Sequence, residues 1–273
     1  MKLTVISLFR DSAAYIASTL DKLDVLNTKY ECDFYFYEND STDNTKELLS
    51  SWMVNKNGKF KTEKLNAPSF GHVAQRDRME RMTYYRNTIL EMATPLDSEY
   101  TLLLDSDVEF DTDIIEKYLD YMKDNVVMTT PFIKQNIKCF MCKCGKRSYY
   151  DSYALRDTKN QLGMTVNCNP FYELEDRKKW DDKKPVKVNS AFGGAALIKT
   201  AVLNKVKWST NGGCEHWNFC KEVREYGDII VIPTIETSTT VDDWVPNPEM
   251  LNKQQQLIDD PWVRMAWFMT APK

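Results

Sequence analysis

Two carboxylates, Asp105 and Asp107, stand two residues apart and directly follow the apolar run Leu102-Leu103-Leu104. Such a run is typical of a buried strand, which gives the turn after it a rigid base. Carboxylate oxygens are hard ligands that suit Mg²⁺ or Mn²⁺, and the phosphates of a diphosphate can complete the coordination of such an ion. Because Asp-x-Asp is a common string, a solvated acidic turn is the alternative interpretation.

Other polar residues follow strand patterns in the same way. Arg10 comes directly after the apolar segment 2–9, and the polar turn at 38–43 comes after the aromatic segment 32–38. The carboxyl ends of parallel strands meet at one rim of a sheet, where such sheets bind ligands. We therefore expect Arg10, the turn at 38–43 and the turn at 105–107 to gather around one site.

The elements that must position these residues alternate between strand and helix. Strand patterns occupy 2–9, 32–38, 100–107 and 126–132, and helical patterns occupy 12–26, 41–52, 74–93 and 111–122. This alternation predicts an α/β fold with a mainly parallel central sheet flanked by helices.

The second half of the chain is less regular. We interpret residues 133–184, which are rich in Lys, Cys, Tyr and Asp, as an irregular excursion that shapes the acceptor side of a pocket. A Gly-Gly turn within 188–203, a helix from about Glu215 to Tyr226 and a strand at 228–233 follow. The Trp-bearing tail at 241–273 is expected to pack back on the domain rather than on a membrane or a partner.

The composition is that of an ordinary folded protein. The 273 residues include 36 basic and 40 acidic side chains, a net charge of −4, which argues against a nucleic-acid partner. Arg10 and Asp11 interrupt the first apolar run too early for a secretory signal, and no apolar stretch is long enough for a transmembrane segment. We expect a cytoplasmic protein, with the trimmed catalytic domain of an anchored protein as the alternative, and the oligomeric state stays open.

Seven cysteines, an odd number, agree with a reducing compartment. Four of them could bind zinc: Cys139, Cys142, Cys144 and Cys168. Structural zinc sites usually contain two clean Cys pairs, which this spacing lacks, so we favour reduced thiols in a lid.

Four segments then follow one another in a recognisable order: Ser7-Leu8-Phe9-Arg10, the turn YENDSTDNT at 37–45, Asp105-Ser106-Asp107, and Phe192-Gly193-Gly194 with Cys214-Glu215-His216. Together they resemble the nucleotide-diphospho-sugar transferases of the GT-A fold over most of residues 1–235. The string YYDSYALRD at 149–157 is similar to one in the fungal capsule-associated mannosyltransferases and their viral relatives, and it has some likeness to the mannan polymerase subunits of yeast.

The resemblance implies a Rossmann-like GT-A sheet that binds a UDP-sugar or GDP-sugar donor with Mn²⁺ or Mg²⁺, and a glycan or glycoprotein acceptor. Glu38 matches the acidic residue that contacts the base or ribose, although it could equally favour a helix dipole. Asp40 stands where the family usually has glycine, and aspartate tolerates the left-handed conformation better than most residues. The expected donor-binding residues are Ser7, Leu8, Phe9, Arg10, Glu38, Asp40, Arg81, Arg86, Asp105 and Ser106, and the expected metal ligands are Asp105 and Asp107.

The helical segment 74–93 carries several arginines. Arg76, Arg81 and Arg86 recur every five residues, so they do not share one helix face, and the resemblance favours Arg81 and Arg86 as diphosphate contacts. We interpret Arg78 as part of a solvated charged face.

Two carboxylates are candidates for catalysis. Glu215 begins a helix after a Gly-Gly-Cys turn and could deprotonate the acceptor hydroxyl, with a role in the helix dipole as the alternative. Asp151, which lies among tyrosines suited to stacking on a sugar, is its rival, and Asp157 is a further alternative for acceptor contact or catalysis. His216 stands where many inverting family members have the catalytic aspartate, which leaves both the base and the stereochemistry open.

We predict a metal-dependent glycosyltransferase that moves a sugar from a nucleoside-diphosphate donor to a glycan hydroxyl. The expected domain spans 1–240, with a nucleotide-sugar half at 1–130 and an acceptor half at 131–240, followed by the tail at 241–273. A sugar-phosphate nucleotidyltransferase is less favoured, because the segment after the first strand lacks the glycines that bind a triphosphate. A non-catalytic nucleotide-sugar-binding module is the third alternative.

Overall fold

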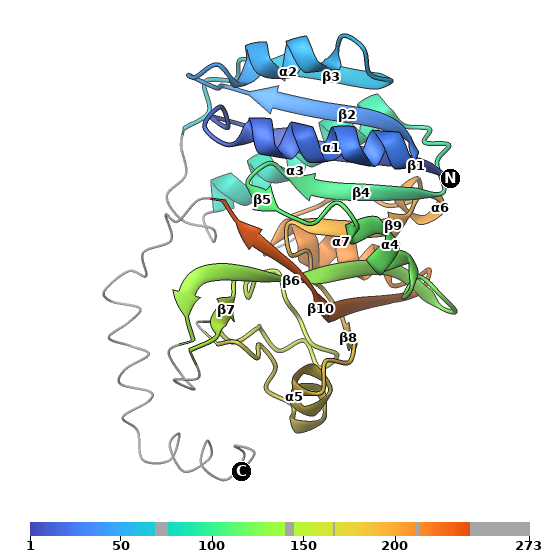
Figure 1. Cartoon of the computed structure of the whole chain (residues 1–273). Coiled ribbons are helices and arrows are strands. Elements are labelled where there is room, and N and C mark those ends of the chain that lie inside the picture. Colours follow the sequence, from blue (N-terminus) through green and yellow to red (C-terminus); the bar gives the residue numbers. More distant parts are fainter. Residues whose placement is uncertain (69–75, 140–144, 166, 211–212, 241–273) are drawn as a thin grey trace. The chain divides into compact units, whose positions relative to one another are not determined.

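The N-terminal part of the chain forms one half of the sheet, in which four strands run parallel to one another (Figure 1). The strand β1 (Lys2–Phe9) pairs with β2 (Glu31–Asn39) on one side and with β4 (Tyr100–Asp105) on the other, and β3 (Gly58–Glu63) extends β2. The register pairs Phe9 with Glu38 and Leu8 with Asp105. The carboxyl ends of β1, β2 and β4 therefore lie side by side at one rim.

Antiparallel pairing enters the sheet in its second half. The strand β9 (Ala195–Lys199) runs antiparallel to both β4 and β6 (Val126–Lys138), whereas β10 (Asp228–Thr239) runs parallel to β6. The short strands β5 (Val108–Glu109), β7 (Arg147–Tyr149) and β8 (Val186–Val188) also pair antiparallel. The α/β class with a central sheet is confirmed, but parallel pairing is confined to two blocks. The excursion after β6 returns to the sheet at the rim where β4 ends. The strand β9 therefore starts at this rim and runs antiparallel to β4.

Helices flank the sheet, with α1 (Ile16–Lys29) in front of it and α3 (Arg76–Ala93) behind it in Figure 1. The buried residues of α1 recur at helical spacing, from Ile16 through Leu20 and Leu23 to Leu26, which gives one apolar face. The remaining helices are α2 (Thr45–Met53), α4 (Ile114–Leu119), α5 (Leu174–Asp181), α6 (Thr200–Leu203) and α7 (Glu215–Val223).

The centre of β4 lies deep in the core. Leu102, Leu103 and Leu104 are at most 3% exposed, and burying each side chain contributes about 1.5–3 kcal/mol to folding. This burial fixes the strand whose end carries Asp105.

The computed structural model describes residues 1–68, 76–139, 145–165, 167–210 and 213–240. The predictions for the tail at 241–273, and for Cys142 and Cys144, fall outside the described residues. Among the residues that are described, no helix is both long enough and apolar enough to cross a membrane.

Candidate active site

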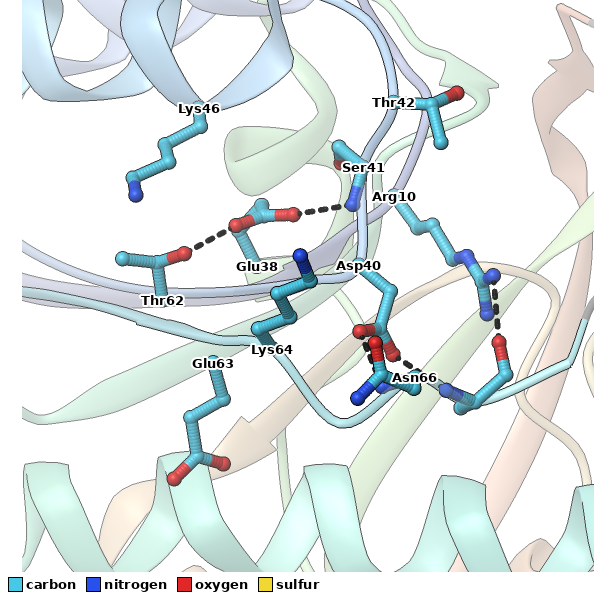
Figure 2. A pocket seen from close by; sticks show the side chains of 11 residues that line it. Arg10, Glu38, Asp40, Ser41, Thr42, Lys46, Thr62, Glu63, Lys64 and Asn66 are labelled. Carbon is cyan, nitrogen blue, oxygen red and sulfur yellow. Dashed lines mark hydrogen bonds between the residues drawn. The ribbon is translucent and has the colours of Figure 1, made fainter.

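Three cavities adjoin along the rim of the parallel strands. The outer cavity, about 520 Å³, lies at the ends of β2 and β3 between Glu38, Lys46 and Asn66 (Figure 2). The middle cavity, about 420 Å³, shares Arg10 with it and reaches Asp107. The inner cavity is about 140 Å³ and shares four residues with the middle one: Arg78, Arg86, Asp105 and Asp107. The shared walls make the three cavities one continuous cleft.

Glu38 lines the outer cavity but is already bonded within the protein. One carboxylate oxygen accepts a hydrogen bond from the backbone N–H of Ser41 at 2.8 Å, and the other accepts one from the Thr62 hydroxyl. The residue is 2% exposed. Its carboxylate is therefore held in a fixed orientation at the wall of the cavity.

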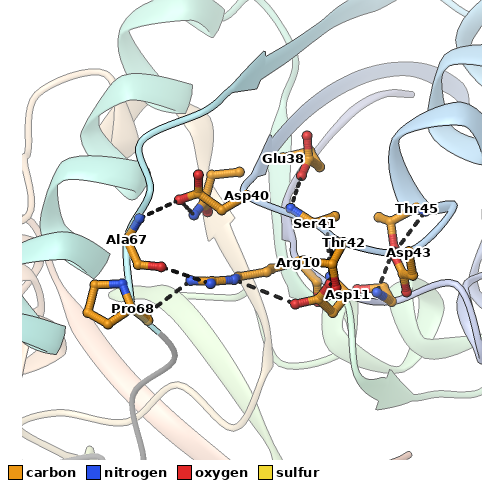
Figure 3. A network of polar contacts seen from close by, with 12 residues as sticks. Arg10, Asp11, Glu38, Asp40, Ser41, Thr42, Asp43, Thr45, Ala67 and Pro68 are labelled. Atoms are coloured by element: carbon orange, nitrogen blue, oxygen red, sulfur yellow. Dashed lines mark hydrogen bonds and ion pairs between the residues drawn. The ribbon is translucent and has the colours of Figure 1, made fainter.

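Asp40 shapes the loop after β3. Its φ of 54° lies in the left-handed region, as the glycine position of the resemblance requires. Its carboxylate accepts backbone N–H bonds from Leu65, Asn66 and Ala67 at 2.7–3.0 Å (Figure 3). Burial favours a higher pKa for Asp40, but these hydrogen bonds outweigh it and lower the pKa. The carboxylate that was expected to contact the donor is thus occupied in holding a loop.

Arg10 closes the same loop from the other side (Figure 3). Its guanidinium donates to the carbonyl oxygens of Ala67 at 2.9 Å and Pro68 at 3.2 Å. Leu8 and Phe9 line the middle cavity beside it. Ser7 does not line any of the three cavities, because it sits one strand position deeper, is 1% exposed and pairs with Phe36 and Leu104.

The turn with Asp105 and Asp107 is anchored at both ends. The N–H of Asp105 donates to the carbonyl of Gly194 at 2.7 Å, and the N–H of Thr240 donates to the carbonyl of Asp107 at 2.8 Å. Between them, Ser106 accepts a hydrogen bond from the Ser12 hydroxyl at 3.2 Å. Backbone bonds to the residue before β9 and to the residue after β10 therefore fix where the two carboxylates stand.

The electrostatics of this pair fit a divalent cation. Burial, together with the nearby charge of Asp105, raises the pKa of Asp107 to about 6. Burial also raises the pKa of Asp105, although Arg86 opposes this. A cation bound by two neighbouring carboxylates offsets the repulsion between their negative charges.

The described residues contain no group of three metal-ligating side chains. A protein that offers Mg²⁺ one or two carboxylates usually leaves the remaining positions to water and substrate phosphates. The Asp105–Asp107 pair fits such a site, in which water and phosphate complete the coordination. It does not fit a site made of protein ligands alone. Cys139 and Cys168, the two described members of the zinc hypothesis, belong to no such group either.

Arg86 lines the inner cavity. Its guanidinium is 3.3 Å from an oxygen of Asp105 and 3.7 Å from an oxygen of Glu215. It also lies over the ring of Phe192, 4.8 Å from the centroid, and its side chain is 8% exposed. Arg86 thus links the metal-side carboxylate to the carboxylate at the start of α7.

Glu215 and His216 begin α7 and line the inner cavity. Burial, together with the positive charge of Arg86, lowers the pKa of His216 to about 3, so this imidazole is neutral near pH 7. Burial acts to raise the pKa of Glu215, but nearby positive charge outweighs burial and leaves the pKa lowered. Because His216 is neutral, Arg86 is the cation that keeps Glu215 ionised.

Asp151 comes from the excursion and lines the inner cavity together with Glu215. One of its oxygens accepts the N–H of Gly193 at 2.7 Å, which the left-handed φ of that glycine, 65°, presents to it. Burial raises the pKa of Asp151 to about 7. Tyr150 and Tyr153 line the same cavity, as expected for a segment suited to a sugar.

The arginines of α3 that line the cavities are not all those that the sequence interpretation favoured. Arg81 is exposed and lines none of the three cavities, since it points about 140° around the helix from Arg86. Arg78, which we had assigned to a solvated face, lines both the middle and inner cavities. Counting back from Arg86 in steps of four, through Met82 to Arg78, would have found it.

Comparison with known proteins gives a family match over most of the chain. The family model described as Cryptococcal mannosyltransferase 1 matches residues 9–224, a span that contains Asp105, Asp107, Asp151 and Glu215. No curated protein matches the chain.

Several solved structures share the fold. S. aureus TarS 1-349 aligns with 16% identity and a TM-score of 0.52 over 88% of this chain and 60% of that chain. The same fragment in complex with UDP-GlcNAc aligns with 15% identity and a TM-score of 0.52, over 100% of this chain and 68% of that chain. Mannosyltransferase PcManGT from Pyrobaculum calidifontis, in complex with GDP-Man and Mn²⁺, aligns with 14% identity and a TM-score of 0.53, over 99% and 65%. At these identities the likeness confirms the GT-A fold alone, and the chain spans about three fifths of the TarS fragment.

Proposed function

The chain belongs to the Cryptococcal mannosyltransferase 1 family, which makes it a glycosyltransferase by family, and we propose on this premise that it moves a sugar from a nucleoside-diphosphate donor to a glycan hydroxyl with the help of Mn²⁺ or Mg²⁺. One observation carries the proposal: Asp105 and Asp107 stand on a rigid turn where the middle and inner cavities meet. Mannose is the favoured sugar, because the family description names it and because PcManGT was solved with GDP-Man and Mn²⁺.

The three cavities suggest how the donor lies. The nucleoside would occupy the outer cavity beside Glu38, the diphosphate the middle cavity beside Arg10 and Ser106, and the sugar the inner cavity. This order places the bond to be broken next to the Asp105–Asp107 turn. The acceptor is proposed to be a glycan or glycoprotein hydroxyl that approaches the inner cavity from the side of Tyr150.

Asp107 is the principal proposed metal ligand. Asp105 already forms an ion pair with Arg86, whereas Asp107 forms no ion pair with a described side chain. A bound divalent ion supplies charge neutralisation for the departing diphosphate. The protein's own part is to hold the two carboxylates still on a turn fixed by Gly194 and Thr240.

Of the two candidate bases, Asp151 is the better supported. A general base works best when its pKa lies near the operating pH, and Asp151 has a pKa of about 7. Glu215 remains ionised beside Arg86, and its lowered pKa makes it the weaker base. We propose that Asp151 accepts the acceptor's proton in an inverting reaction and that Glu215 positions the acceptor; in a retaining reaction Asp151 would only orient the hydroxyl.

The inverting form of this proposal predicts a pH dependence. Asp151 can accept a proton only when it is deprotonated, so the rate at saturating metal and donor should fall about tenfold between about pH 8 and pH 6. Initial rates measured against pH check this, with donor affinity measured at the same pH values to separate the titration of Asp107. A transfer rate that stays flat across this range, with donor bound throughout, would exclude Asp151 as the base.

The function itself is tested with a panel of nucleotide sugars. Wild-type protein with Mn²⁺ should release nucleoside diphosphate from one or a few UDP-sugars or GDP-sugars, and faster when a glycan acceptor is added. Conversion of a nucleoside triphosphate and a sugar phosphate into a nucleotide sugar, with no transfer, would instead support the nucleotidyltransferase alternative. Binding of a nucleotide sugar without any turnover would support the non-catalytic module.

A further inference from the structure

The helix α3 brings two arginines to the cleft, and they stand in different surroundings. Arg78 and Arg86 lie eight residues apart, about two turns along the helix, and both line the middle and inner cavities. The residues that share both cavities also include Asp105 and Asp107. Any group that bridges the two cavities therefore passes both guanidinium groups.

Arg86 is already engaged by the protein. Its nitrogens lie 3.3 Å from Asp105 and 3.7 Å from Glu215, and aromatic rings of Phe192 and Trp208 cover its guanidinium at 4.8 and 6.0 Å. Moving Arg86 onto a phosphate would leave a buried carboxylate without its cation, which is costly. Its surroundings make it a fixed internal cation.

Arg78 has no such engagement. It forms no hydrogen bond and no ion pair with any residue in the described part of the chain, and it is only partly buried. Arg78 lines both cavities together with Asp105 and Asp107. It thus stands beside the proposed metal site with its donors free.

We propose that Arg78 binds the phosphate that leaves with the nucleotide, at the junction of the middle and inner cavities; this inference rests on the proposed function. In the reaction, the bond between the sugar's anomeric carbon and the terminal phosphate oxygen breaks, and its electron pair stays on that oxygen. The anomeric carbon forms a new bond to the acceptor oxygen, whose proton passes to the carboxylate of Asp151. The phosphate gains negative charge, and a guanidinium can stabilise it with two parallel N–H bonds.

The test compares Arg78→Ala and Arg78→Lys with Arg76→Ala. Arg76 is a matched control because it lies on the same helix, has a side chain that is 86% exposed and pairs with Glu80 on the surface. Binding of GDP, GMP, UDP and UMP is measured by calorimetry with Mn²⁺ present, and turnover is measured with the donor found active for the wild type. Circular dichroism and thermal unfolding establish that each variant is folded.

Arg78→Ala should weaken diphosphate binding about tenfold or more and lower kcat about 10²-fold, because charge-assisted hydrogen bonds to the phosphate are lost. Its affinity for the monophosphate should change little, Arg78→Lys should recover part of both losses, and Arg76→Ala should match the wild type. A folded Arg78→Ala variant with wild-type diphosphate affinity and kcat would overturn the inference and leave the proposed function intact. A wild-type chain that binds no nucleoside diphosphate would overturn the proposed function and the role of Arg78 with it.

Discussion

Replacing Asp107 by alanine is expected to lower sugar transfer by about 10³-fold, equivalent to about 4 kcal/mol in the activation barrier, while the chain stays folded. The variant loses the carboxylate that no described ion pair occupies at the junction of the two cavities. The anchoring bond from Thr240 goes to the backbone carbonyl of Asp107, so it survives the substitution. Initial rates at saturating donor and Mn²⁺ give the size of the effect.

The matched control for this prediction is Asp111→Ala. Asp111 follows the same turn by four residues, its side chain is 75% exposed, and it pairs with Lys117 at 3.2 Å on the surface. It lines neither the middle nor the inner cavity. Its removal should leave transfer within about twofold of the wild type, since exposed pairs of this kind contribute little. Equal losses in both variants would point to a general effect on folding and not to a metal ligand.

The second large effect concerns stability. Arg86→Met should destabilise the fold by about 3 kcal/mol, because Glu215, whose side chain is 4% exposed, would keep a buried charge without its cation. Asp105 contributes less to this loss of stability, since its side chain is 32% exposed and water screens its charge. Urea unfolding followed by circular dichroism measures the loss.

The pH dependence of this loss has a definite sign. Without Arg86, burial would raise the folded-state pKa of Glu215 above its unfolded value, so the cost grows as the pH rises through the folded pKa. Arg86→Met should therefore be less destabilising near pH 5 than near pH 8, and adding Glu215→Gln should restore most of the stability. Arg81→Ala, an exposed change on the same helix, should shift stability by less than about 0.5 kcal/mol. If the Arg86→Met, Glu215→Gln double variant were no more stable than Arg86→Met alone, the loss of stability would not come from the unpaired charge of Glu215.

Local patterns were enough to predict three of the four strands in the parallel half of the sheet. The apolar run at 2–9 became β1 with the same bounds, and the run before Asp105 became β4. The strand β3 was missed because its sequence, GKFKTE, carries two lysines and no buried run, as befits a strand at the edge of the sheet. The antiparallel entry of β9 depends on where a long excursion returns, and no local pattern records that.

The site was predictable to the extent that it sits on strand ends. Asp105, Asp107 and Glu215 lie in one cavity because strand and helix ends converge at the rim. Asp151 reaches the same cavity through the pairing of β7 with β6 and a bond from Gly193, both of which are long-range. The carboxylate of Asp40 turned to the loop after β3, and Arg78 rather than Arg81 faced the cleft, because side-chain direction follows backbone geometry that residue types alone do not specify.

The central claim is that Asp107, with Asp105, holds a divalent cation against the phosphates of the donor. Calorimetric titration of Mn²⁺ into the protein, with and without GDP or UDP, tests it most directly. Because the described part of the chain offers this ion at most two ligands, Mn²⁺ should bind weakly alone and at least about tenfold more tightly when the diphosphate is present. Diphosphate binding that is equally tight in Mn²⁺ and in a chelator would contradict the claim.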